Sequence, residues 1–274
     1  MIEKNGEPTI AALVPMRHHS QRVPGKNMRI LDGKPLYHHI LATLLEVPKI
    51  TTIVVDTDSP DIIAGVNTTF PTVKVINRPS DLRADDISMN RILLYDTSQV
   101  QADFYLQTHS TNPLLKAETI SRAIQAFRGA YPANDSLFSV TRLQTRLYSA
   151  DGSALNHDPK VLIQTQDLPP VYEENSCIYL FSADTLQKNG TRIGDTPILF
   201  EIDPRTFEAA LGQARGQLEA QQARWNTAKA NLARIKPLAD LNAVSKKDLD
   251  DSIGAEQAAR AGGNVRVTEA GGGS

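Results

Sequence analysis

The chain has 274 residues and a formal net charge of −2, with 22% charged and 41% hydrophobic residues. This length allows one large domain, or one domain with an appendage. The near-neutral balance gives no electrostatic basis for binding nucleic acid or an anionic membrane surface. Its single cysteine, Cys177, excludes an internal disulfide. The opening residues MIEKNGEPTI lack the apolar core of a signal peptide, and no apolar stretch suits a bilayer span, so we expect a cytoplasmic protein without membrane insertion.

Residues 9–202 alternate between strand-like and helix-like patterns. Five apolar runs have strand composition: IAALVP, TTIVVD, VKVINR, DFYLQTH and SLFSVTR. Helical periodicity lies between them, over 35–46, 60–66, 89–99 and 117–128. Ser59 before Pro60 is a typical helix start. The alternation predicts an α/β fold in which helices cover both faces of a mostly parallel sheet, and ligands bind beyond the carboxyl ends of such strands.

The loop after the first predicted strand concentrates positive charge. Residues 14–27, VPMRHHSQRVPGKN, contain Arg17, Arg22 and Lys26 and no acid. Free backbone N–H groups and the helix dipole favour a phosphate at such a place, and the three cations add charge-assisted bonds. The alternative is a solvated loop, which the position and the number of charges disfavour. The loop is not a Walker A motif, because Asn27 follows the lysine where Ser or Thr is required.

The pattern changes after residue 203. Mostly apolar residues, with one glutamine among them, are spaced alternately by four and three positions and predict a coiled-coil seam: Phe207, Leu211, Ala214, Leu218, Gln221, Trp225, Ala228, Leu232 and Ile235. Pro237 is expected to end this helix, and Ser245 with Asp248 resembles a capping box that starts a second helix over 246–261. We therefore expect an α/β domain (1–203), an antiparallel α-helical hairpin (204–261) and a flexible glycine-rich tail (262–274). The alternative, a helix packed on the core, fits less well with so narrow a seam.

The segment ALVPMRHHSQRVPGKNMRILDGKPLYHHIL resembles the acylneuraminate cytidylyltransferase family, which activates sialic acids and related sugar acids with CTP. The similarity continues through VVDTDS, INRPSDLRADDISMN, FYLQTHSTNPLLKAETI, SLFSVTR and QDLPPVYEENSCIYLF to RIGDTPILFEI, covering about residues 9–202. Each piece is weak alone, but the ordered set is specific. The resemblance implies a Rossmann-like nucleotidyltransferase fold, often dimeric.

The resemblance also assigns site residues. It implies that the hydroxyl of a sugar acid attacks the α-phosphorus of CTP and releases pyrophosphate, helped by Mg²⁺ and by the basic loop. The matching catalytic positions in the triphosphate motif are Arg17, Lys26 and Asn27, and the matching nucleotide-binding positions are Ser20, Arg22, Arg78, Met89, Asn90 and Gln107.

On the sugar side the sequence departs from the family. Where sialic-acid enzymes carry an arginine before Pro-Asn, this chain has Glu173 and Glu174. These acids repel a carboxylate unless Arg142, Arg146 or Arg192 neutralises them, so we expect an acceptor other than ordinary sialic acid. The predicted sugar-binding residues are Arg146, Glu173, Glu174 and Asn175.

The expected metal motif is missing as well. The family places an Asp-Ile-Asp run after the FEI strand to hold Mg²⁺, whereas here FEI is followed by DPRTFEAALG and Asp203 is the nearby candidate. A single carboxylate makes a weak Mg²⁺ site. Asp56 and Asp58 suit turns or caps better than the metal. We therefore expect CTP binding with impaired turnover; a nucleotide-binding pseudoenzyme is the alternative.

Residues 199–261 have a second resemblance, to the start of the α-helical hairpin in periplasmic membrane-fusion adaptors of efflux pumps. The two resemblances overlap at LFEID, residues 199–203, which predicts a chimera. A fragment acting as an efflux adaptor through its hairpin is the second alternative. Among the histidines, His18 and His19 lie in the basic loop, while His109, after Gln107, is left open between a ligand role and a structural one; none is assigned to a metal.

Overall fold

The computed structural model describes residues 6–18, 23–202 and 205–271, with side chains for the same residues except 205–210 and 262–271. The chain divides into two compact units, residues 1–28 with 35–203 and residues 29–34 with 204–274. Among the described residues, no helix is both long and apolar enough to cross a membrane.

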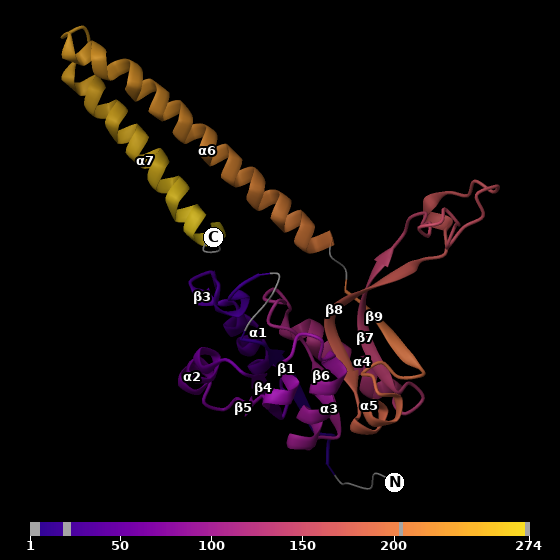
Figure 1. Ribbon diagram of the computed structural model, residues 1–274. Helices are drawn as coiled ribbons and strands as arrows, with labels where there is room; N and C mark the ends of the chain where they lie inside the picture. Colours follow the sequence, from indigo (N-terminus) through magenta and orange to yellow (C-terminus); the bar gives the residue numbers. More distant parts are fainter. Residues whose placement is uncertain (1–5, 19–22, 203–204, 272–274) are drawn as a thin grey trace. The chain divides into compact units, whose positions relative to one another are not determined.

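The first unit is built on a seven-stranded sheet (Figure 1). Its strands are β1 (Ile10–Met16), β4 (Thr52–Thr57), β5 (Lys74–Asn77), β6 (Phe104–Gln107), β7 (Ser136–Leu143), β8 (Val171–Phe181) and β9 (Pro197–Glu201). Their order is β5-β4-β1-β6-β8-β7-β9. Pairs β4–β5, β1–β4, β1–β6 and β7–β9 are parallel, while β8 runs antiparallel to both neighbours. The prediction of a mostly parallel sheet is confirmed.

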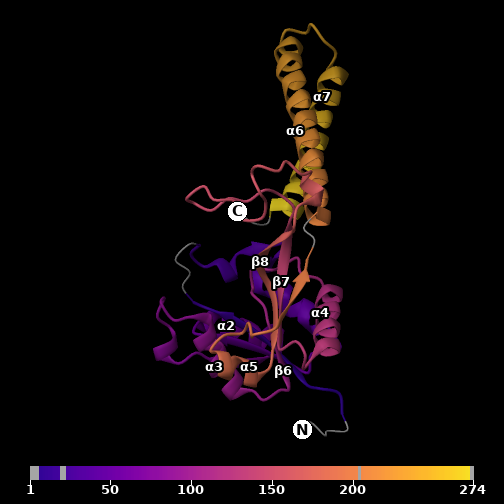
Figure 2. The same cartoon turned by 90° about the vertical axis from the view of Figure 1, so that its right-hand side faces the viewer.

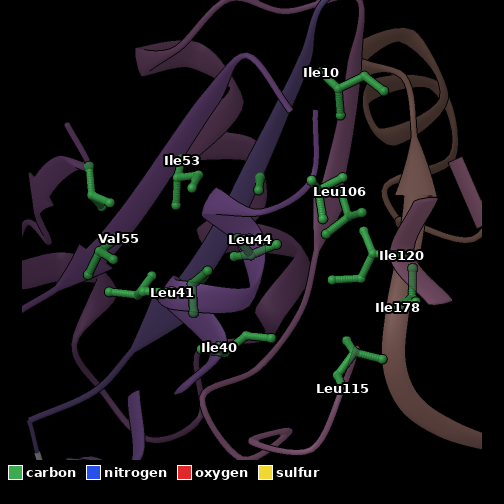
Figure 3. Packing of buried hydrophobic residues seen from close by; sticks show 14 of the residues in the cluster. Ile10, Ile40, Leu41, Leu44, Ile53, Val55, Leu106, Leu115, Ile120 and Ile178 are labelled. Carbon is green, nitrogen blue, oxygen red and sulfur yellow. The ribbon is translucent and has the colours of Figure 1, made fainter. Parts of the chain in front are cut away.

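Helices cover both faces of this sheet, as predicted. They are α1 (Leu36–Leu45), α2 (Pro60–Thr69), α3 (Met89–Gln99), α4 (Ala117–Ala130) and α5 (Ala183–Asn189), with short 3₁₀ turns η1 (Lys26–Met28), η2 (Ser80–Leu82) and η3 (Thr165–Asp167). Side chains of α1, α2 and α4 pack into one core cluster, and those of α3 and α5 into a second. Figure 3 shows Leu41 and Leu44 of α1 beside Ile53 and Val55 of β4 in the larger cluster. The unit is therefore a three-layer α/β/α fold.

Local sequence signals explain several element boundaries. The Oγ of Ser59 accepts a hydrogen bond from the N–H of Ile62 at 3.4 Å, which confirms the predicted cap of α2. A short hairpin, β2 (Ile30–Leu31) and β3 (Lys34–Pro35), turns at Asp32 and Gly33 with φ of 48° and 72°. Two successive positive φ values are typical of the tight turns that connect antiparallel strands.

The parallel strands deliver their following loops to one edge of the sheet. Strands β1, β4, β5 and β6 are mutually parallel through β1 and β4, so their carboxyl ends lie together. The described parts of the segments after them are 17–18 with 23–25, 58–59, 78–88 and 108–116. Most of the predicted nucleotide-binding residues lie on or next to these segments.

The second unit contains two long antiparallel helices, α6 (Arg205–Asp240) and α7 (Lys246–Gly271), which lie side by side (Figures 1 and 2). Leu218, Trp225 and Leu232 are half-buried at the expected seam positions. The Nε1–H of Trp225 donates to Glu256 of α7 at 2.7 Å. The capping box is confirmed: Ser245 N–H donates to the Asp248 carboxylate, and Asp248 N–H donates to Ser245 Oγ, both at 3.1 Å.

Two predicted boundaries in this unit are wrong. Helix α6 continues past Pro237 to Asp240. Proline cannot donate a backbone hydrogen bond to the preceding turn, but its carbonyl oxygen still accepts one from Leu241 N–H at 3.3 Å. Helix α7 runs beyond residue 261 to Gly271, through residues that glycine content had placed in a flexible tail.

Candidate functional site

The basic loop after β1 is tied to the loop before α3. One guanidinium nitrogen of Arg17, Nη1, lies 2.7 Å from Asp85 Oδ1, and Nη2 lies 3.4 Å from the Asp85 carbonyl oxygen. Both side chains are partly exposed, at 36% and 54%, so this ion pair is weakly held. An incoming phosphate can therefore replace the carboxylate of Asp85 on Arg17. Ser20 and Arg22, predicted for the same loop, lie outside the described residues.

Asn27 links the basic loop to the segment after β6. Its side chain is 4% exposed; Nδ2 donates to the carbonyl of Arg17 at 3.1 Å, and Oδ1 accepts from Ser110 Oγ at 2.6 Å. The predicted direct catalytic contact stays a prediction, while these bonds give Asn27 a positioning role. Lys26, next to it, is close enough to His109 for its charge to lower the pKa of that imidazole. The loops after β1 and β6 therefore contact each other and form one candidate site.

The structure shows a structural role for Arg78, while its predicted place near the nucleotide stays a prediction. Its side chain is 1% exposed, and Nε donates to Asp56 Oδ2 at 2.9 Å, so the guanidinium is buried and paired with this carboxylate. Its carbonyl oxygen accepts two hydrogen bonds from the guanidinium of Arg83, at 2.7 and 2.8 Å. Arg78 thus anchors the start of the 78–88 loop, which carries the Asp85 partner of Arg17.

At the end of β6, Gln107 meets an arginine from a distant segment. Arg192, which follows α5, donates from Nη1 to Gln107 Oε1 at 2.6 Å, and its backbone N–H donates to Asn90 Oδ1 at 3.3 Å. Burial lowers the pKa of Arg192, a shift opposed mainly by Tyr179 and Glu174. Met89, beside Asn90, packs half-buried against the second core cluster. Gln107 and Asn90, both predicted from sequence, are therefore joined by Arg192.

The two acids of β8, Glu173 and Glu174, have different surroundings. Glu174 accepts a hydrogen bond from the Tyr179 hydroxyl and lies 3.6 Å from Arg192, whose guanidinium stacks 3.5 Å from the Tyr179 ring centroid. Burial, together with this bond to Glu174, raises the pKa of Tyr179. Glu173 is exposed and pairs with Thr141 in the β7–β8 ladder. Of the three arginines considered as neutralisers, Arg192 is the one that reaches Glu174 in the described structure.

Two predicted sugar-binding residues are occupied elsewhere. Asn175 Oδ1 accepts from Ser139 Oγ at 2.6 Å and from Cys177 N–H at 3.2 Å, so its side chain stabilises the irregular β7–β8 pairing. Arg146 donates to the carbonyl oxygen of Ile163 within the segment between β7 and β8. These contacts give both residues a structural role, and their predicted part in sugar binding stays a prediction.

Two histidines, His18 in the basic loop and His109 after β6, lie near the predicted nucleotide-binding residues. The N–H of His18 donates to Asp58 at 2.7 Å, and its ring lies 2.9 Å from Ser59 Oγ, so His18 joins the loop to the start of α2. His109 lies beside Gln107, with 3.3 Å between Gln107 Nε2 and His109 Nε2. Burial, then the charges of Arg192 and Lys26, lower the pKa of His109 to about 4. His109 is therefore a neutral imidazole between two cations.

The Mg²⁺ ion implied by the resemblance needs oxygen ligands from the protein or from the nucleotide. Among the residues that the structure describes, no group of three or more His, Cys, Asp or Glu side chains comes together, although Mg²⁺ often needs only one or two carboxylates besides the phosphates of a nucleotide. Asp203, the sequence candidate, lies outside the described residues. The role of Mg²⁺ therefore stays a prediction.

Comparison with known proteins decides the family. A family model described as cytidylyltransferase matches residues 11–249. The chain belongs to the cytidylyltransferase family. This cytidylyltransferase is 31% identical over 191 residues to CMP-N,N'-diacetyllegionaminic acid synthase of Legionella pneumophila, covering 66% of the chain and 81% of that relative. The family match runs well past residue 202, where the sequence resemblance had been placed to end.

Solved structures share the fold of this cytidylyltransferase. A CMP:2-keto-3-deoxy-manno-octonic acid synthetase complexed with CTP has a TM-score of 0.55 and 18% identity, covering 76% of this chain and 99% of that one. A 4-diphosphocytidyl-2C-methyl-D-erythritol synthase from Anaerococcus prevotii has a TM-score of 0.51 and 13% identity, with 72% and 87% coverage. The predicted Rossmann-like nucleotidyltransferase fold is confirmed, and the chain is a nucleotidyltransferase.

A second set of relatives matches a short part of the chain. Multidrug resistance protein MdtA of Proteus mirabilis is 44% identical over 62 residues, 23% of this cytidylyltransferase. The chain spans only 15% of the length of that relative. The efflux-adaptor resemblance is thus supported for a short segment, while a chimeric origin stays a prediction.

The sequence did not single out Arg192 as a central residue of the site. It was one of three arginines considered as neutralisers of the β8 acids, but its contact with Gln107, 85 positions earlier, was not predicted because the fold creates it. Ser110 and Asp85 were likewise missed. No local pattern marks either, because each acts by pairing with a residue far away along the chain, Asn27 and Arg17 respectively.

Proposed function

We propose that this chain transfers CMP from CTP to a hydroxyl of a sugar acid and releases pyrophosphate. A bond forms between the acceptor oxygen and the α-phosphorus, the bond from the α-phosphorus to the bridging oxygen breaks, and the hydroxyl proton is lost. The proposal is supported by family membership and by the relative whose name prints a CMP-sugar acid product. The single observation that carries it is the link between the basic loop and the end of β6 through Asn27 and Ser110.

In this proposal the basic loop binds the triphosphate. Arg17 exchanges its exposed partner Asp85 for phosphate oxygens, and Lys26 adds a second positive charge nearby. Asn27 holds the loop in place from its buried position. Phosphoryl transfer depends mainly on position and charge neutralisation, which such a loop supplies.

On the acceptor side, we propose a sugar acid other than ordinary sialic acid. Arg192 lies between Gln107 and Glu174 and brings positive charge to a place where β8 carries two acids. Glu173 and Glu174 accept hydrogen bonds, which suits hydroxyl or amide groups of a sugar better than a bare carboxylate.

Mg²⁺ remains part of the proposal only as an ion that arrives with the nucleotide. When bound, it neutralises the charge of the triphosphate. Because the described carboxylates do not gather in a group of three or more, the phosphates of the nucleotide would supply most of its ligands. A homodimer, which the resemblance implies, also stays a prediction, and sedimentation velocity tests it.

The test is pyrophosphate release by the full chain with CTP and a panel of nine-carbon and eight-carbon sugar acids, and with ATP, GTP and UTP as nucleotide controls. Release that requires CTP and one sugar acid supports the proposal. Binding of CTP without release from any acid would indicate the pseudoenzyme alternative. Equal use of ordinary sialic acid would overturn the proposed selectivity.

A further inference from the structure

Three residues at the end of β6 form a hydrogen-bond chain that neither the family nor the relatives' names assign. Arg192 Nη1 donates to Gln107 Oε1 at 2.6 Å. On the other side of the same amide, Gln107 Nε2 donates to the Thr108 carbonyl at 2.9 Å and lies 3.3 Å from His109 Nε2. The chain runs from Arg192 through Gln107 to His109.

Elementary donor and acceptor rules fix every orientation in this chain. A guanidinium has no acceptor, so Gln107 must present its oxygen to Arg192 and its NH₂ group to His109. An amide nitrogen only donates, so His109 Nε2 must be the unprotonated nitrogen that accepts. A neutral imidazole then carries its proton on Nδ1.

The surrounding charges act in the same direction. Burial, Arg192 and Lys26 lower the pKa of His109 to about 4, so the ring stays neutral from about pH 5 upward. Lys26 belongs to η1 in the basic loop, and Arg192 follows α5 and is paired with Glu174 of β8. The pKa of His109 is therefore lowered by Lys26 on the proposed phosphate side and by Arg192 on the proposed sugar side. Within the described structure, its Nδ1 has no hydrogen-bond partner.

We propose that His109 is a substrate-contacting residue whose Nδ1–H donates a hydrogen bond to a phosphate oxygen of the bound nucleotide, with Arg192 as the positioning residue that fixes its tautomer through Gln107. A neutral donor between two cations binds an anionic oxygen without adding a third buried charge. The ring does not serve as a base at Nε2, because Gln107 occupies that nitrogen. This inference rests on the proposed binding of CTP.

The tautomer is tested by NMR on the full chain labelled with ¹⁵N-histidine. His109 is expected to show an unprotonated Nε2 and a protonated Nδ1 throughout pH 5.5–8, with no titration near the usual histidine pKa of about 6.5. In Arg192→Met the pKa of His109 rises and the tautomers mix. The control Arg142→Met removes an exposed arginine of β7 and leaves His109 unchanged. A protonated Nε2 in the parent chain, or no response to Arg192→Met, overturns the inference.

The contact is tested by calorimetric titration with CTP and cytidine. His109→Asn keeps an N–H donor close to the place of Nδ1, whereas His109→Gln moves it toward Nε2 and His109→Leu removes it. CTP is expected to bind about tenfold more weakly to the Leu and Gln variants, and within about twofold of the parent for Asn, because one hydrogen bond to a charged group is lost or kept. Cytidine, which lacks phosphate, binds equally to all.

The outcomes separate the two proposals. If the parent chain binds no CTP, the proposed function fails. If the parent binds CTP and His109→Leu binds it equally well, only the inference about His109 fails. A loss with His109→Asn as large as that with His109→Leu also overturns the assigned Nδ1 contact.

Discussion

Replacing Asp96 with asparagine is expected to stabilise the α/β unit above neutral pH. Asp96 of α3, Asp56 of β4 and Arg78 are at most 1% exposed and lie together. Arg78 pairs with Asp56 at 2.9 Å, but no donor reaches either carboxylate oxygen of Asp96, which forms a hydrogen bond with Asp56 only when it holds a proton. Two buried carboxylates and one guanidinium leave a surplus negative charge, which a proton on Asp96 removes.

The sign of the effect follows from this proton. Burial, followed by the charge of Asp56, raises the pKa of Asp96 from 3.8 to about 8. Between these values the folded protein holds a proton that the unfolded chain releases, so the free energy of unfolding falls as pH rises through the window from about 4 to 8. Below pH 4 both states are protonated and the penalty disappears.

The magnitude follows from linkage. One proton of difference changes the free energy of unfolding by ~1 kcal/mol per pH unit. Asparagine keeps the shape, donates N–H to Asp56 as a protonated carboxyl does, and does not titrate. From pH 5 to pH 7, Asp96→Asn is therefore expected to gain about 3 kcal/mol relative to the parent, since each pH unit contributes a little more than ~1 kcal/mol.

Urea denaturation at pH 5, 6, 7 and 8 measures this gain. All seven tyrosines lie within residues 1–203 and the single tryptophan, Trp225, lies in α6, so near-UV circular dichroism from tyrosine follows the α/β unit and Trp fluorescence follows the hairpin. Asp86→Asn, which removes an exposed carboxylate, is the matched control and should show no such gain. Parallel pH profiles for Asp96→Asn and the parent would refute the shared-proton reasoning.

Three further predictions concern the site and the hairpin. Arg17→Met should weaken CTP binding about tenfold yet change the free energy of unfolding by less than about 1 kcal/mol, because its ion pair with Asp85 is exposed; equal CTP affinity in titration would contradict this. Ser110→Ala should cost about 1 kcal/mol in urea denaturation and also weaken CTP binding, because Asn27 loses a buried partner; an unchanged affinity would show that Asn27 does not position the loop. Removal of residues 204–274 should leave CTP affinity within about twofold, whereas a large loss would assign the hairpin a part in nucleotide binding.

Much of the fold could be predicted from local patterns. Ser59 before Pro60 and the Ser245–Asp248 box act within one helical turn, so the sequence displays the whole interaction. Buried parallel strands such as β1 and β4 read as apolar runs because both their faces are covered. The end of α6 was misplaced because a proline near a helix terminus disrupts few bonds.

The site was less predictable, because its residues act in pairs from distant segments. The resemblance placed Arg78 near the nucleotide but gave no sign that Asp56 draws its guanidinium inward. Asn175 appeared in a sugar-binding stretch, yet the irregular pairing of β7 and β8 uses its side chain. Arg192 was one of three arginines that could neutralise the β8 acids, and the fold selects it because β6, β8 and the segment after α5 lie side by side.

The central claim is that the basic loop between β1 and α1 binds the triphosphate of a nucleotide. Calorimetric titration of the full chain with CTP, CMP and cytidine tests it most directly. The account predicts that affinity increases steeply with phosphate count and declines with rising salt, as expected for charge-assisted contacts with Arg17 and Lys26. Equal affinity for CTP and cytidine, or no binding of CTP at all, would contradict it.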